Sequence, residues 1–173
     1  CCDIVKVDFS LTVPDKHRTV LHMHQANMLE NLHESYQLYG ERPIEHLYRI
    51  GALGRNVVLV HMLHVNSREI EMLAKTNSNV VHCPNTAMKL AYGLSAFGNF
   101  PEMKEAGVNV SIGTDASDCS NFNDMIRLMY LSAVTPKDYR YDAAAGSAEN
   151  AIEMATINGA KALNMEKEIG SLE

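Results

Sequence analysis

Several short apolar runs in this chain end in a residue that can bind a metal; these residues are His24, His61, His82 and Asp115. The runs read TVLHMH, NVVLVH, NVVH and VNVSIGTD, and their last residues are 37, 21 and 33 positions apart, which is about one strand and one helix per step. Imidazole and carboxylate are good ligands for zinc and related divalent ions. A metal can lower the pKa of bound water towards 7, and a neighbouring carboxylate can take the proton. The pattern predicts a metal-dependent hydrolytic site in which Asp115 serves as ligand and base.

Each of these residues also has a simpler explanation. A lone histidine at a strand end is usually hydrogen-bonded to backbone, and Asp in Gly-Thr-Asp can cap the next turn. Four such residues at successive strand ends favour a functional role over four separate structural ones. His64 could take the place of His61, whereas His22 is expected to point to the face opposite His24. Cys83 is interpreted as a small buried apolar residue, because no partner for a zinc–thiolate site stands at ligand spacing.

The apolar runs have the β-branched composition of strands that are buried on both faces of a parallel sheet. We expect strands over 4–9, 56–61, 79–83 and 108–113, besides the one ending at His24. Periodicity and stop signals predict helices over 28–39, 43–51, 66–75, 101–106, 124–134 and 148–163. Asn66 with Glu69 resembles a capping box. The stretches 84–98 and 135–146 are interpreted as loops, the first of them facing the substrate.

This alternation predicts an α/β protein of the TIM-type (β/α)8 barrel class, in which catalytic groups lie at the carboxyl ends of the strands. A full barrel needs about 250 residues, so 173 residues with four strand–helix units predict half a barrel. Only nine residues separate the strand at 4–9 from Thr19. A parallel crossover needs a dozen or more, so residues 1–18 form an irregular or broken junction.

Composition narrows the classes of function. The net charge is −6 and no Lys or Arg cluster occurs, which argues against nucleic-acid or membrane-surface binding. No apolar run reaches the length of a membrane span, and no signal peptide is evident. Four cysteines without a C-x-x-C motif favour a reducing, cytoplasmic setting. The first residue is Cys rather than Met, which suggests a fragment or a processed product.

Five segments closely resemble the second half of metal-dependent amidohydrolases. They read HMHQAN, VHMLHVNSREIEMLA, VVHCPNTAMKLAYG, FPEMKEAGVNVSIGTD and MATINGAKALNMEKEIGSLE. The resemblance covers about residues 19–173 and is nearest to the branch of atrazine chlorohydrolase, S-adenosylhomocysteine and methylthioadenosine deaminases, and related nucleobase or pterin deaminases. It implies one partial barrel domain over 1–173 that contains strands 5–8. The family's first-strand His-x-His pair and small β-sandwich are absent from this sequence.

The resemblance also implies roles for individual residues. His24 on the fifth strand and Asp115 on the eighth would bind one divalent metal, zinc foremost and iron as the alternative. His61 on the sixth strand would join the metal set and orient the hydrolytic water or the substrate. The residues expected to bind substrate are Asn27, His64 and His82.

The implied activity is hydrolytic deamination of a purine, pterin, pyrimidine or triazine-like substrate by metal-bound hydroxide, in a homo-oligomer. Two positions depart from the family pattern. Asn27 stands where many members have a proton-transferring Glu, and Thr86-Ala87 replaces a frequent Ser-Asn. These departures keep a second hypothesis open, a catalytically impaired homologue that acts as a binding or assembly subunit. A doubly wound nucleotide-binding domain is disfavoured, because no glycine-rich phosphate loop occurs.

Overall fold

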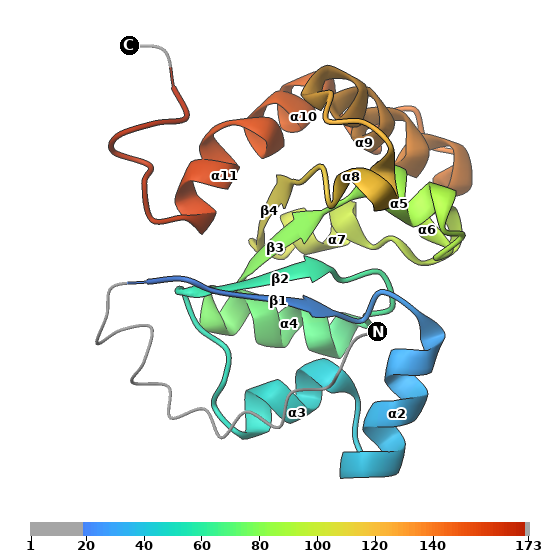
Figure 1. Cartoon of the computed structure of the whole chain (residues 1–173), viewed down its shortest axis with the longest axis vertical. Coiled ribbons are helices and arrows are strands. Elements are labelled where there is room, and N and C mark those ends of the chain that lie inside the picture. Colours follow the sequence, from blue (N-terminus) through green and yellow to red (C-terminus); the bar gives the residue numbers. More distant parts are fainter. Residues whose placement is uncertain (1–18, 172–173) are drawn as a thin grey trace.

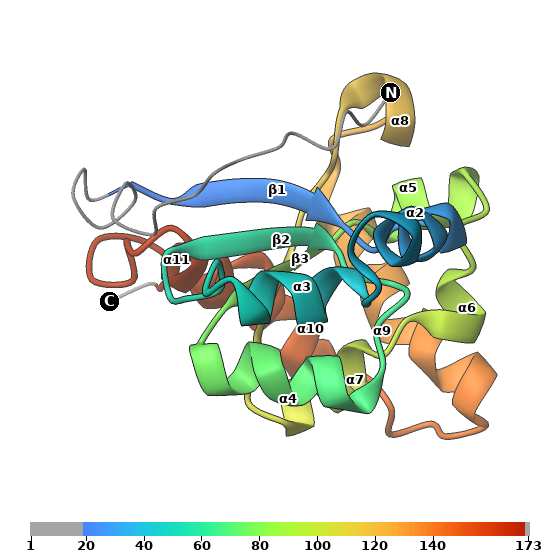
Figure 2. The same cartoon turned by 90° about the horizontal axis from the view of Figure 1, so that it is seen from below.

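The computed structural model describes residues 19–171, which form a parallel sheet with helices packed against it (Figure 1; Figure 2). The strands are β1 (Leu21–Gln25), β2 (Val57–His61), β3 (Asn79–His82) and β4 (Asn109–Ile112). The helices are α2 (Leu29–Tyr39), α3 (Pro43–Arg49), α4 (Ser67–Thr76), α5 (Pro84–Lys89), α6 (Leu94–Phe97), α7 (Phe100–Glu105), α8 (Ser117–Ser120), α9 (Met125–Arg140), α10 (Ala148–Ala155) and α11 (Ile157–Ala162). The expected strand at 4–9 and the junction over 1–18 lie outside the described residues.

The sheet has the parallel order that the sequence predicts. Its spatial order is β1-β2-β3-β4, and each neighbouring pair runs parallel. All five residues of β2 are buried, as its sequence VVLVH requires of a strand covered on both faces. Parallel neighbours need crossover connections, so every strand ends at the same edge of the sheet. This edge brings His61 and Asp115 together.

One face of the sheet is covered by helices and forms the main core. Figure 2 shows α3 and α4 on the same side of the sheet. The buried side chains of this core come from strands and helices alike and include Ile44, Leu59, Leu73, Val80, Met103, Val110, Ile112, Leu128 and Met154. On β1 the side chains alternate, and His22 and His24 are its exposed members.

The start of α4 is fixed by the predicted capping box. The Asn66 side chain accepts a hydrogen bond from the Glu69 backbone N–H at 2.9 Å, and the Glu69 carboxylate accepts one from the Asn66 backbone N–H at 3.0 Å. Both donors would otherwise lack a partner at the helix start. The predicted helix start is therefore confirmed.

Replacing Asn66 with Ala should lower the free energy of unfolding by about 1 kcal/mol, because the Glu69 backbone N–H loses its acceptor. Urea unfolding monitored by circular dichroism would measure the loss. Ser67→Ala, at the exposed next position, is the matched control and should change stability by less than about 0.5 kcal/mol. Equal stability of the Asn66 variant and the wild type would contradict the role of the cap.

The expected loop over 84–98 is wrong, because this stretch contains α5 and α6. Pro84 occupies the first turn of α5, where its fixed φ suits a helix and its missing N–H costs nothing. Thr86 and Ala87 are buried in this short helix. Burial against the rest of the fold stabilises a helix that has no regular apolar period of its own.

Two further boundaries differ from prediction. α9 continues through Pro136 to Arg140, so the loop expected over 135–146 begins only after that residue. Arg140 is fixed by two hydrogen bonds to the Glu102 carboxylate, at 2.9 and 2.7 Å, which hold the end of α9 against α7. The single helix expected over 148–163 is two helices, since the backbone breaks at Thr156 with φ −128° and ψ −96°. None of the described helices is long and apolar enough to cross a membrane.

Candidate metal centre

Three side chains with metal-binding atoms converge beyond the carboxyl ends of neighbouring strands. They belong to His61 at the end of β2, Cys83 directly after β3 and Asp115 beyond β4, and one ligand atom of each lies within 4.8 Å of the others. His61 Nε2 is 4.0 Å from Asp115 Oδ2. The parallel order of β2, β3 and β4 brings these residues together, although 54 positions separate the first from the last.

His61 is the histidine of this group and is buried, with a side-chain exposure of 3%. Burial, followed by the nearby His24, lowers its pKa to about 4, while Asp115 acts in the opposite direction. The imidazole is therefore neutral at pH 7, which is the form that binds metals. Its Nδ1 atom is buried and has no hydrogen-bond partner. The other ring nitrogen, Nε2, is the one that lies 4.0 Å from Asp115 Oδ2.

The backbone at His61 and at Asp115 lies in the left-handed region of φ and ψ. His61 has φ 77° and Asp115 has φ 60°, values that are uncommon for residues other than glycine. Such conformations persist only where the surroundings hold them, and they cluster at functional sites. The Asp115 Oδ1 atom accepts a hydrogen bond from the Ala116 backbone N–H at 2.7 Å, which fixes the carboxylate. The Oδ2 atom is thereby directed towards His61.

His24 lies beside this group, and its neighbour His22 shares its face. The His24 and His61 ring centroids are 4.8 Å apart, with the rings nearly perpendicular. The expectation that His22 points away from His24 is wrong, because residues two apart on a strand project to the same face. Both side chains are exposed on β1. Partial desolvation, followed by the neighbouring His24, lowers the pKa of His22 even though the side chain is still exposed.

Cys83 is buried, as predicted, but its position was not foreseen. Burial raises the pKa of its thiol to about 12, with a further contribution from the Asp115 carboxylate. The absence of partner cysteines in the sequence argues against a zinc–thiolate role, but sulfur can share a metal with histidine and carboxylate from other elements. One signal was present in the sequence: Cys83 directly follows the His82 strand end, at the level of His61 and Asp115.

His82 projects to the sheet face opposite His24, which pairs through Val60 with Val81. It pairs in register with Ile112, a core residue, and its ring centroid lies 3.8 Å from that of Phe100. Burial, and secondarily His61, lowers its pKa to about 3, so its ring is neutral. The side chain lines a cavity on the helix-covered side, and that lining includes none of His61, Cys83 and Asp115.

The two remaining predicted substrate-binding residues are buried outside the group of three. Asn27 is 6% exposed and follows β1. His64 is also 6% exposed, and one of its ring nitrogens lies 3.1 Å from the Tyr92 carbonyl oxygen. Among the described residues, His64 is not a member of the metal-binding group that contains His61. Its role as a substitute for His61 is therefore not supported by position.

The donor set fits a divalent transition metal. A neutral imidazole with an unpartnered nitrogen, a fixed carboxylate and a thiol sulfur are the ligand types that zinc and iron take in proteins. His24 offers a further imidazole next to His61. Chemically, this arrangement can hold a cation and place a carboxylate beside any water bound to it.

Comparison with known proteins gives consistent matches over nearly the whole chain. The Amidohydrolase family profile matches residues 8–173. A 5-methylthioadenosine/S-adenosylhomocysteine deaminase of Thermoanaerobacter pseudethanolicus is 37% identical over 155 residues, which is 90% of this chain and 35% of that relative. The chain thus spans about a third of the length of the curated relatives that it matches.

Two solved structures show the same fold. A zinc-bound adenosine deaminase of Xanthomonas campestris superposes with a TM-score of 0.89 at 32% identity, covering 94% of this chain and 36% of that one. The zinc complex of atrazine chlorohydrolase from Arthrobacter aurescens gives 0.84 at 25% identity, with coverages of 94% and 35%. The fold of the described residues therefore matches about a third of these enzymes.

Proposed function

This chain belongs to the amidohydrolase family, and on that premise we propose that the natural protein containing it is a metal-dependent hydrolase that deaminates a heterocyclic substrate. Its four parallel strands and their helices correspond to part of the family's β/α barrel. The observation that carries the proposal is the approach of His61 and Asp115, 4.0 Å apart at the carboxyl edge of the sheet. In a barrel enzyme this edge is the catalytic one.

In this proposal His24, His61 and Asp115 would hold one divalent metal, with zinc as the first choice because two structural neighbours contain it. When bound, the metal supplies a water molecule of lowered pKa. The Asp115 carboxylate would accept a proton from the attacking water and deliver it to the departing amine, so that the amino-substituted ring and water would give a ring carbonyl and ammonia. The ring nitrogen of His61 that does not bind the metal would donate a hydrogen bond to the substrate atom on which negative charge develops.

We propose an amino-substituted purine as the substrate class. Support comes from the relatives named as deaminases of methylthioadenosine, S-adenosylhomocysteine and adenosine. Asn27 and His64 are candidates to bind this substrate. His82 remains a candidate for substrate binding because it lies at a strand end. Its ring, however, packs on Phe100 at the helix-covered face. An amide such as Asn27 cannot transfer a proton, which leaves Asp115 to do so.

The location, assembly and partners of the protein are also part of the proposal. We place the protein in the cytoplasm as a homo-oligomer that binds a small molecule, with no nucleic-acid or membrane partner. The two cysteines in the described residues, Cys83 and Cys119, are both free thiols, which suits a reducing compartment. We also assign residues 1–173 to one barrel domain as its strands 5–8.

Metal content is the first measurement to make. The natural protein should bind about one zinc or cobalt ion per chain, and His61→Ala should weaken binding by at least about tenfold. His24→Ala should have a similar effect, because both imidazoles would be lost ligands. Cobalt titration followed by visible absorption, with elemental analysis, measures this directly.

The matched control is His33→Ala, which removes an exposed histidine on α2 whose Nε2 atom hydrogen-bonds to Gln37. This variant should bind metal like the wild type. Unchanged affinity in both the His24 and His61 variants would contradict the assigned ligands. Full metal occupancy without ammonia release from purines, pterins or triazines would instead favour the impaired homologue.

A further inference from the structure

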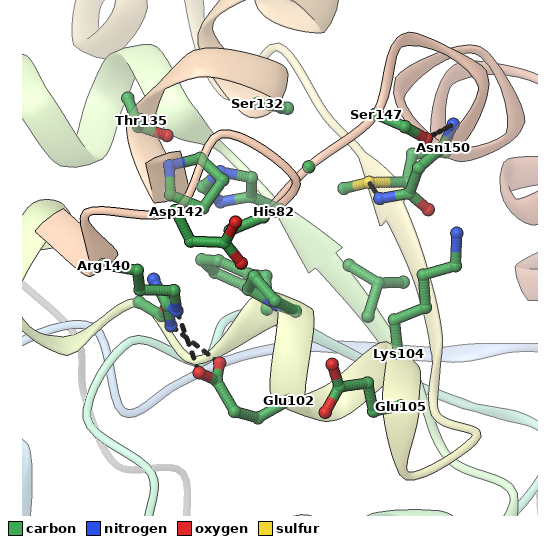
Figure 3. A pocket seen from close by; sticks show the side chains of 18 of the residues that line it. His82, Glu102, Lys104, Glu105, Ser132, Thr135, Arg140, Asp142, Ser147 and Asn150 are labelled. Carbon is green, nitrogen blue, oxygen red and sulfur yellow. Dashed lines mark hydrogen bonds and ion pairs between the residues drawn. The ribbon is translucent and has the colours of Figure 1, made fainter. Parts of the chain in front are cut away.

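A cavity of about 570 Å³ lies on the helix-covered side of the sheet, between α7, α9 and α10 (Figure 3). Its base includes Val110 and His82, which the strand register places on one face of the sheet. His24 belongs to the opposite face, because it pairs with Val60, which pairs in turn with Val81. The cavity lining includes none of His24, His61, Cys83 and Asp115, so the cavity is distinct from the candidate metal centre.

Unpartnered polar atoms mark this cavity as unusual. The His82 Nδ1, Ser132 Oγ and Asn150 Oδ1 atoms are buried without a hydrogen-bond partner, and all three residues line the cavity. Figure 3 shows these side chains around the same space, from β3, α9 and α10. The His82 residue as a whole is 2% exposed. Buried polar groups are nearly always hydrogen-bonded. Three unpartnered polar atoms at one cavity therefore point to a bound molecule that both donates and accepts hydrogen bonds.

The charges around the cavity argue against an anion. The charged side chains that line it are Glu102, Lys104, Glu105, Arg140 and Asp142, three acidic against two basic. Arg140 is engaged by the Glu102 carboxylate and by the Gly98 carbonyl, to which it donates at 3.1 Å. Lys104 Nζ lies 3.7 Å from a Glu153 carboxylate oxygen. Both cations are thus paired, and buried His82 stays neutral.

We propose that this cavity is a second binding site, for a small uncharged aromatic molecule whose edge both donates and accepts hydrogen bonds. Its volume falls within the range of about 300–1,000 Å³ that is typical of small-molecule sites. Apolar side chains supply the walls, among them Leu94, Phe100, Pro136 and Met154. The three unpartnered polar atoms supply the polar contacts. The proposal does not depend on the deaminase assignment, because the site uses none of the proposed metal ligands.

The test uses two probes of nearly equal size and shape, nicotinamide and nicotinate. Nicotinamide is uncharged and carries an amide that donates and accepts, whereas nicotinate is an anion without that donor. In a titration of the chain followed by ¹H–¹⁵N NMR, nicotinamide should shift the resonances of Ser132, Ala145 and Asn150. Nicotinate should bind at least about tenfold more weakly, because the acidic lining repels it.

Variants test the polar contacts. Ser132→Ala and Asn150→Leu should each weaken nicotinamide binding by about three- to tenfold, the effect of one lost hydrogen bond. Ser95→Ala, an exposed serine outside the cavity lining, should leave binding unchanged. The proposal is overturned if neither probe binds, which would mean that the cavity holds only water. Equal binding of both probes, unchanged binding in both variants, or shifts confined to residues around Asp115 would overturn it as well.

Discussion

Asp115→Asn should reduce ammonia release by the natural protein at least about 1,000-fold and leave its fold intact. A positioned acid–base group contributes about 10²–10⁴-fold, and Asp115 is also a proposed metal ligand. An amide keeps the oxygen that accepts from the Ala116 backbone N–H at 2.7 Å, so the local turn is retained. It cannot take a proton from water, and it is a poorer ligand than a carboxylate. Turnover measured at saturating zinc separates the two losses.

Asp118→Asn is the matched control, because Asp118 is an exposed carboxylate three positions further along. Its turnover should remain within about twofold of the wild type, as expected for a surface change. Circular dichroism melting of both variants would verify the fold. Wild-type turnover in metal-loaded Asp115→Asn would refute the proton-transfer role, whatever the metal measurements show.

Glu69→Ala should lower the free energy of unfolding by about 2–5 kcal/mol, the largest stability loss that we expect from a polar residue. Glu69 is fully buried at the start of α4. Its carboxylate accepts from Arg42 Nε at 2.7 Å, from the Asn66 backbone N–H at 3.0 Å and from the Ile44 backbone N–H at 3.4 Å. Removing it leaves a guanidinium that is 18% exposed and two backbone donors without this acceptor.

Urea unfolding would measure this loss, with Glu71→Ala as the control. Glu71 lies two positions further along the same helix and is exposed, so its replacement should cost less than about 0.5 kcal/mol. Similar losses in the two variants would show that the carboxylate of Glu69 has no special role. The effect also bears on the site, since Arg42 donates to the His64 carbonyl at 2.7 Å and so steadies the segment after His61.

Much of the fold could be predicted because its signals are local. The β-branched runs place β2, β3 and β4 to within one or two residues, and the Asn66–Glu69 capping box marks the start of α4. Strand–helix alternation is enough to predict a parallel sheet, since parallel neighbours need crossovers. The predicted resemblance to amidohydrolases is confirmed by the family match over 8–173. The errors at α5, past Pro136 and at Thr156 arise where burial or distant contacts override weak local preference.

The residue types of the candidate site could also be predicted from the sequence, but the positions of their side chains could not. Residue types at successive strand ends select His24, His61, His82 and Asp115 as candidates, because parallel strands end at one edge, and the family resemblance assigns their roles. Only the tertiary structure decided that Cys83 joins His61 and Asp115, while His82 faces a separate cavity with Ser132 and Asn150. Which side chains meet across elements depends on register and on the backbone turn at each strand end. Those are set by packing over the whole sheet rather than by neighbouring residues.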